Sequence, residues 1–349
     1  MLISQSLSRF DDHLTMKTTK PILIALAACL PVGTASAQLS SNLIGLWEFE
    51  GNLTEVSGAH AGNLHDGTWD GTGAYTSGPP ALPVDPGGSF GQALDLDGSN
   101  GVFINNTSNV DPSYAGTFDA DIASANAITI SFWAQGTPGT WNPFVCKFGE
   151  LSEGWQVRKR GASPNATFTL QGTGGAIDPV GANTAANDAG WKHFVAVWDG
   201  VSGTRKLYVN GVEDSTMTIA AGDTAPTGGP GAAVVNYLTF GMRDAGSGTF
   251  GNNFTGQIDD VAIWSRALTE LEILHVSTHA VSDAIASTDT DSDGLFDDDE
   301  ATLGTLPNNP DTDGDGVDDF TEVKMGTNPL SDDDDDMDGL LNSEENTGS

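Results

Sequence analysis

The sequence predicts an all-β sandwich for most of its length, and three observations carry this prediction. The 349 residues include 44 Gly and 16 Pro, a composition that favours short strands joined by turns. Within Trp191–Glu213, both faces of segment 193–198 are largely apolar, which indicates a strand covered on both sides. Asn210 and Gly211 follow a second strand at 206–209 and predict a tight hairpin, because both central residues of a type I′ turn need positive φ.

Further strands are expected along the chain, each bounded by Gly, Pro or Asp. In segment 127–134, Ile128, Ile130 and Phe132 alternate with other residues, so the even-numbered side chains are expected in the core. The expected strands are 43–49, 93–96, 102–104, 127–134, 144–147, 155–159, 166–171, 193–198, 206–209, 237–242 and 256–264. Segment 52–86 is interpreted as loop. Thr269 and Glu272 form a capping-box pattern that predicts a short helix after the last strand.

The formal charge of −35 is concentrated near the C-terminus. Segment 283–349 contains 22 Asp and Glu residues and one Lys, a net charge of −21. This acidity argues against a nucleic-acid partner. We therefore expect three parts after the N-terminal segment: a sandwich at 38–280, a linker at 281–288 that few contacts cross, and a separate acidic unit at 289–349.

The N-terminal segment 1–37 has the parts of a secretory signal peptide. Basic residues follow Met16, an apolar stretch occupies 22–32, and Ala35-Ser36-Ala37 resembles a cleavage site. We interpret Met16 as the start, Gln38 as the mature N-terminus and the protein as secreted, without a transmembrane segment. A second interpretation takes Cys29 as the acylated residue of a lipoprotein at the cell surface. After ordinary cleavage only Cys146 remains, which excludes an intramolecular disulfide.

Several motifs together resemble a known family over about residues 42–276. They are GLWEFEGN, ALDLDGS, TISFW, WKHFVAVWDG, KLYVNG and GQIDDVAIWSRAL. This set is similar to the laminin-G-like jelly roll of the concanavalin A-like lectin/glucanase superfamily. The resemblance implies a jelly-roll sandwich, and a structural calcium bound by Asp259 of the last strand with groups near Glu50. The alternative for Asp259 is that its buried carboxylate accepts N–H bonds from a loop.

The acidic C-terminal part contains three copies of one pattern, beginning at Asp289, Asp311 and Asp334. Each copy has oxygen-bearing side chains at positions 1, 3, 5, 9 and 12, and glycine at position 6. With the carbonyl of position 7, such a loop supplies the oxygen ligands that Ca²⁺ requires. The expected ligands are Asp289, Asp291, Asp293, Leu295, Asp297 and Glu300; Asp311, Asp313, Asp315, Val317, Asp319 and Glu322; and Asp334, Asp336, Asp338, Leu340, Asn342 and Glu345.

Short exit segments distinguish these copies from paired EF-hands. Gly304 and Gly326 leave barely one helical turn after the first two loops. The spacers GTLPNNP and GTNPLSD resemble those of bacterial thrombospondin type 3-like repeats, and this resemblance implies an extended tail of calcium-binding loops. A solvated acidic tail without metal is the alternative.

The sequence offers little support for catalysis. It lacks the E-x-D-x-x-E string of the superfamily's retaining β-glucanases, and it has no HExxH or GxSxG motif and no Asp-box. Glu48 and Glu50 could imitate a carboxylate pair, but we interpret them as charges at the end of a strand. Sugar stacking requires exposed aromatic rings, for which Trp141 is the first candidate, followed by Trp69 and Trp133.

These observations predict a secreted, non-catalytic binding or adhesion protein. Its jelly roll would recognise an extracellular glycan or protein, and its calcium-ordered repeats would act as a spacer. A glycoside hydrolase or lyase of the jelly-roll superfamily is one alternative, and a structural component of the cell envelope is another.

Overall fold

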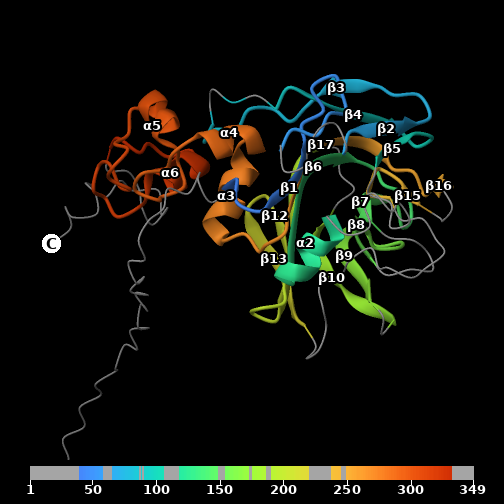
Figure 1. Ribbon diagram of the computed structural model, residues 1–349. Helices are drawn as coiled ribbons and strands as arrows, with labels where there is room; N and C mark the ends of the chain where they lie inside the picture. Colours follow the sequence, from blue (N-terminus) through green and yellow to red (C-terminus); the bar gives the residue numbers. More distant parts are fainter. Residues whose placement is uncertain are drawn as a thin grey trace, which may run out of the picture. The chain divides into compact units, whose positions relative to one another are not determined.

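The computed structural model describes residues 39–57, 65–85, 88, 90–105, 118–147, 154–172, 175–185, 190–219, 237–244 and 249–331. Two antiparallel sheets form a β-sandwich (Figure 1), which confirms the predicted fold class. The first sheet contains, in spatial order, β13 (Val212–Thr218), β12 (Thr204–Val209), β11 (Lys192–Asp199), β6 (Ala127–Gly136), β17 (Thr255–Trp264), β4 (Gln92–Asp97) and β3 (Tyr75–Ser77), and β1 (Leu43–Trp47) also pairs with β17.

The second sheet completes the sandwich. Its order is β10 (Gly175–Ala185), β9 (Asn165–Gly172), β8 (Gly154–Lys159), β7 (Pro143–Lys147), β14 (Thr239–Phe240), β5 (Gly101–Ile104) and β2 (Gly67–Asp70). β15 (Arg243–Asp244) and β16 (Phe250–Gly251) pair with each other as a separate two-stranded sheet. The helices are α2 (Phe118–Ala125), α3 (Glu270–Thr278), α4 (Val281–Ala286), α5 (Asp297–Leu303) and α6 (Asp319–Met325).

One apolar cluster fills the space between the two sheets. Ile128, Ile130 and Phe132 of β6 belong to it, as their alternation predicted. Trp155 and Trp198 are completely buried in the same cluster. Burial of side chains of this size supplies the main driving force for such a fold.

The two-sided apolar pattern of β11 has a specific cause. Its inner face contributes Phe194 and Trp198 to the central cluster. Its outer face contributes Val195 and Val197 to a second cluster, which also contains Phe296 from the acidic part of the chain. The first sheet is therefore covered on its outer face, by residues of α3 and α4 and by the start of the first repeat.

The tight turn and the helix cap agree with the sequence pattern. Asn210 and Gly211 have φ values of 51° and 76° between β12 and β13, as a type I′ turn requires. Thr269 caps α3: its Oγ1 accepts the Glu272 N–H at 3.3 Å, and a Glu272 carboxylate oxygen accepts the Thr269 N–H at 2.8 Å. The turn and the cap could be predicted because each depends only on residues that are close together in the sequence.

Several elements were not expected from the sequence. Strands β2 and β3 lie within segment 52–86, which was interpreted as loop, and the expected set omitted β10, α2 and α4. Strand β10 contains Gly, Pro and Asn and follows no alternation, and its pairing with β9 has two register shifts. Such strands form because a neighbouring strand offers backbone partners, which a propensity pattern does not record.

The expected linker 281–288 is also a correction. Residues 281–286 form α4, whose Val281 and Ala284 are buried. The Val281 N–H donates to the Asp260 carboxylate at 2.9 Å, and Phe296 lies beyond the helix in the same cluster as Trp264. Contacts therefore do cross this segment, because the few apolar residues of the first repeat are buried against the sandwich.

The N-terminal interpretations, including the signal peptide and Cys29, fall on residues 1–38, outside the described part of the chain. Among the helices that are described, none has the length and apolar character needed to cross a bilayer. Cys146 is buried on β7.

Candidate functional site

The first acidic loop folds around its carboxylates. The side chains of Asp289, Asp291 and Asp293 each offer an oxygen atom, and these three atoms lie within 4.8 Å of one another. Backbone N–H groups hold the carboxylates in place: Ser292 donates to Asp289 at 2.6 Å, and Leu295 donates to Asp293 at 2.7 Å. The loop is thus closed by bonds between its own carboxylates and its own backbone.

The second loop repeats this arrangement. Asp311, Asp313 and Asp315 form the same kind of triad. Gly314 donates its N–H to Asp311 at 2.7 Å, and Val317 donates to Asp315 at 2.8 Å. Gly294 and Gly316, at position 6 of the two loops, have φ values of 114° and 105°, which side chains rarely adopt. The predicted role of glycine at this position is confirmed.

The carboxylates at position 9 have hydrogen-bond partners that the sequence analysis did not identify. Both oxygens of Asp297 accept bonds from Thr290, one from its N–H and one from its hydroxyl, each at 2.9 Å. Asp319 accepts the same pair from Thr312, at 2.9 and 2.7 Å. These carboxylates close their loops at the first residue of α5 and α6, and the threonine at position 2, which the sequence analysis left out, is their partner.

Position 12 of the first loop is a buried acid. Glu300 is completely buried, and neither of its carboxylate oxygens has a hydrogen-bond partner among the described residues. Burial and the carboxylates of Asp291 and Asp293 raise the pKa of Glu300 to about 8. Burial first, and then the carboxylates of Asp291 and Asp289, raise the pKa of Asp293 to about 7. An unpaired buried carboxylate is costly, so the residues present fit a bound cation.

The remaining loop ligands vary in what the structure shows. Leu295 and Val317 occupy position 7, where only the backbone carbonyl would bind, and Leu295 is buried in a cluster with Phe320. Glu322 is buried at position 12 of the second loop. All the expected ligands of the third copy, Asp334, Asp336, Asp338, Leu340, Asn342 and Glu345, lie outside the described residues.

The first loop is joined to helix α3 through two histidines. His275 Nε2 lies 3.0 Å from Asp289 Oδ2, and His279 Nε2 lies 2.7 Å from Asp299 Oδ2. The Phe296 ring lies with its centroid 4.4 Å from each of the two imidazole centroids. Residues four apart share one side of a helix, so His275 and His279 together hold the apolar residue of the loop.

Asp259 and Glu50 have different hydrogen-bond partners, and after burial the charge of Glu50 is among the causes that raise the pKa of Asp259. Glu50 accepts the Gln92 N–H on both of its carboxylate oxygens at 3.2 Å. Asp259 is buried, and one of its oxygens accepts the Asp260 N–H at 2.9 Å. Burial raises the pKa of Asp259 to about 10. The alternative of a carboxylate that accepts backbone N–H bonds describes part of this arrangement.

Asp260, which the sequence analysis did not select, lines a cavity together with Glu48 and Glu50, the two acids that follow β1. Strand β17 pairs with β4 through Ile258 and with β1 from Val261 onward, and its register shifts between these points. Asp260 has a φ of 46° there and is buried. With Glu48, Glu50 and Asp283 it lines a cavity of about 130 Å³. Burial, then the charge of Glu48, raises the pKa of Asp260 well above its ordinary value.

Trp141 is the aromatic candidate that the structure leaves exposed. It lies between β6 and β7, with 43% of its surface accessible and a φ of 67°. The guanidinium carbon of Arg158 lies 4.5 Å from its ring centroid. Gly161 approaches the ring so closely that an added Cβ would lie 2.8 Å from it. The ring is therefore held in one place at the surface.

The other two aromatic candidates differ from Trp141. Trp69 on β2 is half-buried and packs edge-on against Tyr75, with ring centroids 5.8 Å apart. Trp133 is only 4% exposed and packs against Phe90 and His193. The face of Trp133 that packs on Phe90 is thus covered, and the ring is much less accessible for stacking than that of Trp141.

The sandwich and its sheet order define the class of protein. The family model described as Laminin_G_3, concanavalin A-like lectin/glucanases superfamily, matches residues 100–274. This match covers half of the chain, and the chain belongs to this superfamily. A search of the curated proteins found no match.

Solved structures with the same kind of fold are distant in sequence. Domain 4 of AbnA, a GH43 extracellular arabinanase from Geobacillus stearothermophilus in complex with arabinotriose, has 19% identity and a TM-score of 0.49, over 66% of this chain and 96% of that one. The binding domain of Paraclostridial Mosquitocidal Protein 1 has 15% identity and a TM-score of 0.47, over 69% and 52%. This chain thus spans about half the length of the mosquitocidal domain. At these values the likenesses do not bear on what this chain binds.

Proposed function

We propose that this protein is a secreted, non-catalytic binding protein whose acidic loops bind Ca²⁺ and whose jelly roll binds a glycan. One observation carries the proposal: the first two loops repeat the same carboxylate triad and the same backbone bonds. Calcium prefers six to eight oxygen ligands, and the loops supply carboxylates with no cationic side chain among the predicted ligands. The spacers between the loops support the resemblance to thrombospondin type 3-like repeats.

Calcium titration of the full chain by isothermal calorimetry tests this proposal. The variant Asp293→Asn with Asp315→Asn removes one carboxylate from each described loop and should lose two of the three expected binding events at millimolar calcium. Asp298→Asn is the matched control, because Asp298 is exposed and lies outside the ligand positions. Equal binding by the control and the double variant would contradict calcium binding in these loops.

The cavity beside Asp260 is a second candidate for a cation. Its volume of about 130 Å³ is below the range of sites that enclose a small organic ligand. Glu48, Glu50 and Asp283 bring three further carboxylates to it. A cation there would join the residues that follow β1 to Asp260 of β17 and to α4.

Glycan binding is the proposed role of the surface around Trp141. The ring is exposed and fixed, as stacking on a sugar requires. Among the described residues, Arg158 pairs with no carboxylate, and it lies against this ring in a protein of net charge −35. We therefore propose a sugar that carries a carboxylate group as the preferred ligand.

A glycan array with acidic and neutral oligosaccharides tests this role. Trp141→Ala and Arg158→Gln should each weaken binding, and Arg158→Gln should act only on acidic sugars. Val201→Ala is the control, since Val201 is 85% exposed in another turn. Absence of binding to every glycan would favour a protein ligand or a structural role in the cell envelope.

The hydrolase or lyase alternative is tested on the same preparations. Release of reducing ends from a bound glycan, abolished by Glu48→Gln or Glu50→Gln, would replace the non-catalytic proposal. Asp70→Asn on β2 is the control for loss of an acidic side chain elsewhere.

A further inference from the structure

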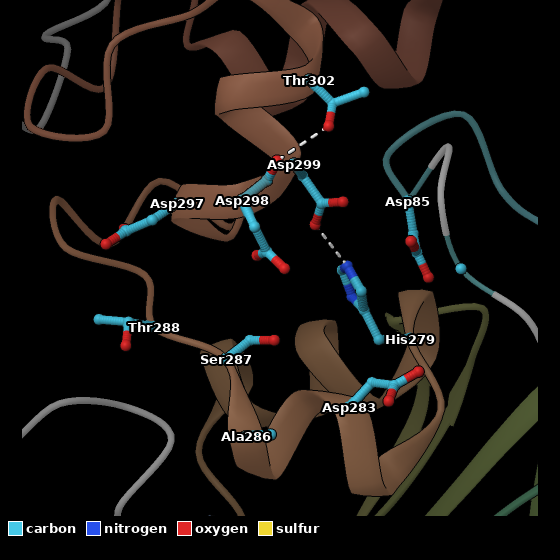
Figure 2. A pocket seen from close by; sticks show the side chains of 11 residues that line it. Asp85, His279, Asp283, Ala286, Ser287, Thr288, Asp297, Asp298, Asp299 and Thr302 are labelled. Atoms are coloured by element: carbon cyan, nitrogen blue, oxygen red, sulfur yellow. Dashed lines mark hydrogen bonds and ion pairs between the residues drawn. The ribbon is translucent and has the colours of Figure 1, made fainter.

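A cavity of about 590 Å³ lies where α4, α5 and the turn around Asp85 meet (Figure 2). Five carboxylates line it, and the described lining residues include a single imidazole and no lysine or arginine. The carboxylates belong to Asp85, Asp283, Asp297, Asp298 and Asp299, and the imidazole to His279. Asp283 and Asp298 are exposed, whereas Asp85 and Asp299 are buried, and a buried carboxylate is costly unless it is paired.

Three of these side chains converge from separate segments. Asp85, His279 and Asp299 are 5%, 3% and 7% exposed, and each offers one ligand atom within 4.8 Å of the other two. Figure 2 shows the His279 ring between the two carboxylates. Gly88 packs over Asp85 so tightly that a Cβ there would overlap the carboxylate. The cluster is therefore enclosed by the fold and differs from a solvated acidic surface.

The hydrogen bonds of His279 indicate which nitrogen is available to a ligand. Thr278 Oγ1 lies 3.1 Å from the carbonyl oxygens of Leu274 and His275, so its single hydrogen has backbone acceptors. The hydroxyl oxygen then accepts from His279 Nδ1, which lies 2.9 Å away. In the neutral ring this leaves Nε2 without a hydrogen.

The bare Nε2 faces a second acceptor. It lies 2.7 Å from Asp299 Oδ2, and two lone pairs at this distance repel unless a cation or a proton lies between them. A proton would make the ring an imidazolium paired with Asp299. A metal ion would satisfy Nε2, Asp299 and Asp85 together.

We propose that Asp85, His279 and Asp299 bind a divalent transition-metal ion of the Zn²⁺ type, with its remaining coordination position open to the cavity. One imidazole nitrogen with two carboxylates suits Zn²⁺, whereas the repeat loops offer only oxygen and suit Ca²⁺. In a tetrahedral site, ligand atoms about 2.0–2.2 Å from the ion lie about 3.3–3.6 Å apart. Binding would therefore lengthen the 2.7 Å contact between His279 Nε2 and Asp299 Oδ2, while all three ligand atoms already lie within 4.8 Å of one another. The ion would join a turn of the jelly roll to α5.

Zinc binding by the full chain in millimolar calcium tests this site, with any affinity tag removed. Calorimetry should show one Zn²⁺ per chain beyond the calcium sites, and Co²⁺ should give visible d–d absorption bands. Asp85→Asn and His279→Gln should each weaken zinc binding by at least about 10-fold. His193→Gln is the matched control, because it removes another buried imidazole, on β11, that belongs to no group of metal-ligating side chains among the described residues. It should bind zinc as the unchanged chain does.

A second measurement avoids dependence on variant folding. In the unchanged chain, stoichiometric Zn²⁺ should shift the side-chain NMR resonances of His279 and leave those of His193 in place. Zinc uptake that Asp85→Asn leaves unchanged, or an unaffected His279 ring, would overturn the proposal and leave a charged His279–Asp299 pair. Equal loss of zinc in His193→Gln would overturn it as well, since the effect would then not belong to this cluster.

Discussion

His275 Nε2 lies 3.0 Å from Asp289 Oδ2, and both side chains are completely buried. Asp289 is position 1 of the first acidic loop, whereas His275 belongs to the helix that closes the jelly roll. Within the described part of the chain, His275 Nδ1 has no hydrogen-bond partner, so Nε2 makes the one polar contact of the ring there. A loop that we propose to bind calcium is thus oriented by a residue of the sandwich.

Substitution of His275 should weaken calcium binding in the first loop. Loss of a hydrogen bond that orients a metal ligand typically reduces affinity by about 10- to 100-fold, so His275→Gln should show this reduction at one site. Calorimetric titration measures it. The second loop should keep its affinity, and a uniform loss at both sites would contradict the specific coupling of His275 and Asp289.

Substitution of Phe296 should destabilise the whole sandwich. Its ring is completely buried beside Trp264 and Val197, and Phe→Ala changes in such sites cost about 3–5 kcal/mol. Urea unfolding in calcium, followed by tryptophan fluorescence, measures this cost. Leu306→Ala, with Leu306 49% exposed, should change stability by less than about 0.5 kcal/mol. A chain ending at Ala280 should be destabilised for the same reason as Phe296→Ala, and native stability of that chain would show that α4 and Phe296 contribute little.

Calcium affinity of the first loop should rise with pH. Burial and neighbouring carboxylates raise the pKa of Asp293 to about 7 and of Glu300 to about 8. In the metal-free protein, the stability gained from these protonated groups is present at low pH and is lost as pH rises through 7 to 8. Calcium competes with those protons, so affinity measured from pH 5.5 to 8.5 should increase over this window and then level off. A flat profile would mean that neither group meets the ion, and Asp298→Asn should leave the profile unchanged.

His193 should make the sandwich sensitive to acid. Complete burial lowers the pKa of His193 from 6.5 to about 3, and its Nε2 lies 2.7 Å from the Ser131 hydroxyl. Below pH 6.5 the unfolded chain takes up a proton that the folded chain excludes, so stability is lost as pH falls. Between pH 7 and pH 5 this group alone should cost roughly 2 kcal/mol.

Urea unfolding at the two pH values checks the contribution of His193. His193→Gln should be less stable at pH 7 but should lose less stability on acidification than the unchanged chain. An identical pH dependence of the two proteins would assign the acid sensitivity to other groups.

The sequence by itself determined those features that depend on neighbouring residues. Ile128, Ile130 and Phe132 lie in the core because strand periodicity places alternate side chains on one face. Asn210–Gly211 and the Thr269–Glu272 cap follow from local stereochemistry, and so does the positive φ of Gly294 and Gly316. The carboxylate triads also follow from spacing along a short loop.

Only the tertiary structure decided which distant segments meet. Trp133 packs against Phe90, which is distant in the sequence. Asp260 is buried at the point where the pairing of β17 with β4 ends and its pairing with β1 begins. Asp85 and Asp299 are far apart in the chain, yet both reach His279. Phe296 lies in an acidic segment whose sequence indicates exposure to solvent, but its ring is buried against the apolar outer face of the first sheet. Such contacts depend on the total apolar surface that the fold must bury, which no short pattern in the sequence contains.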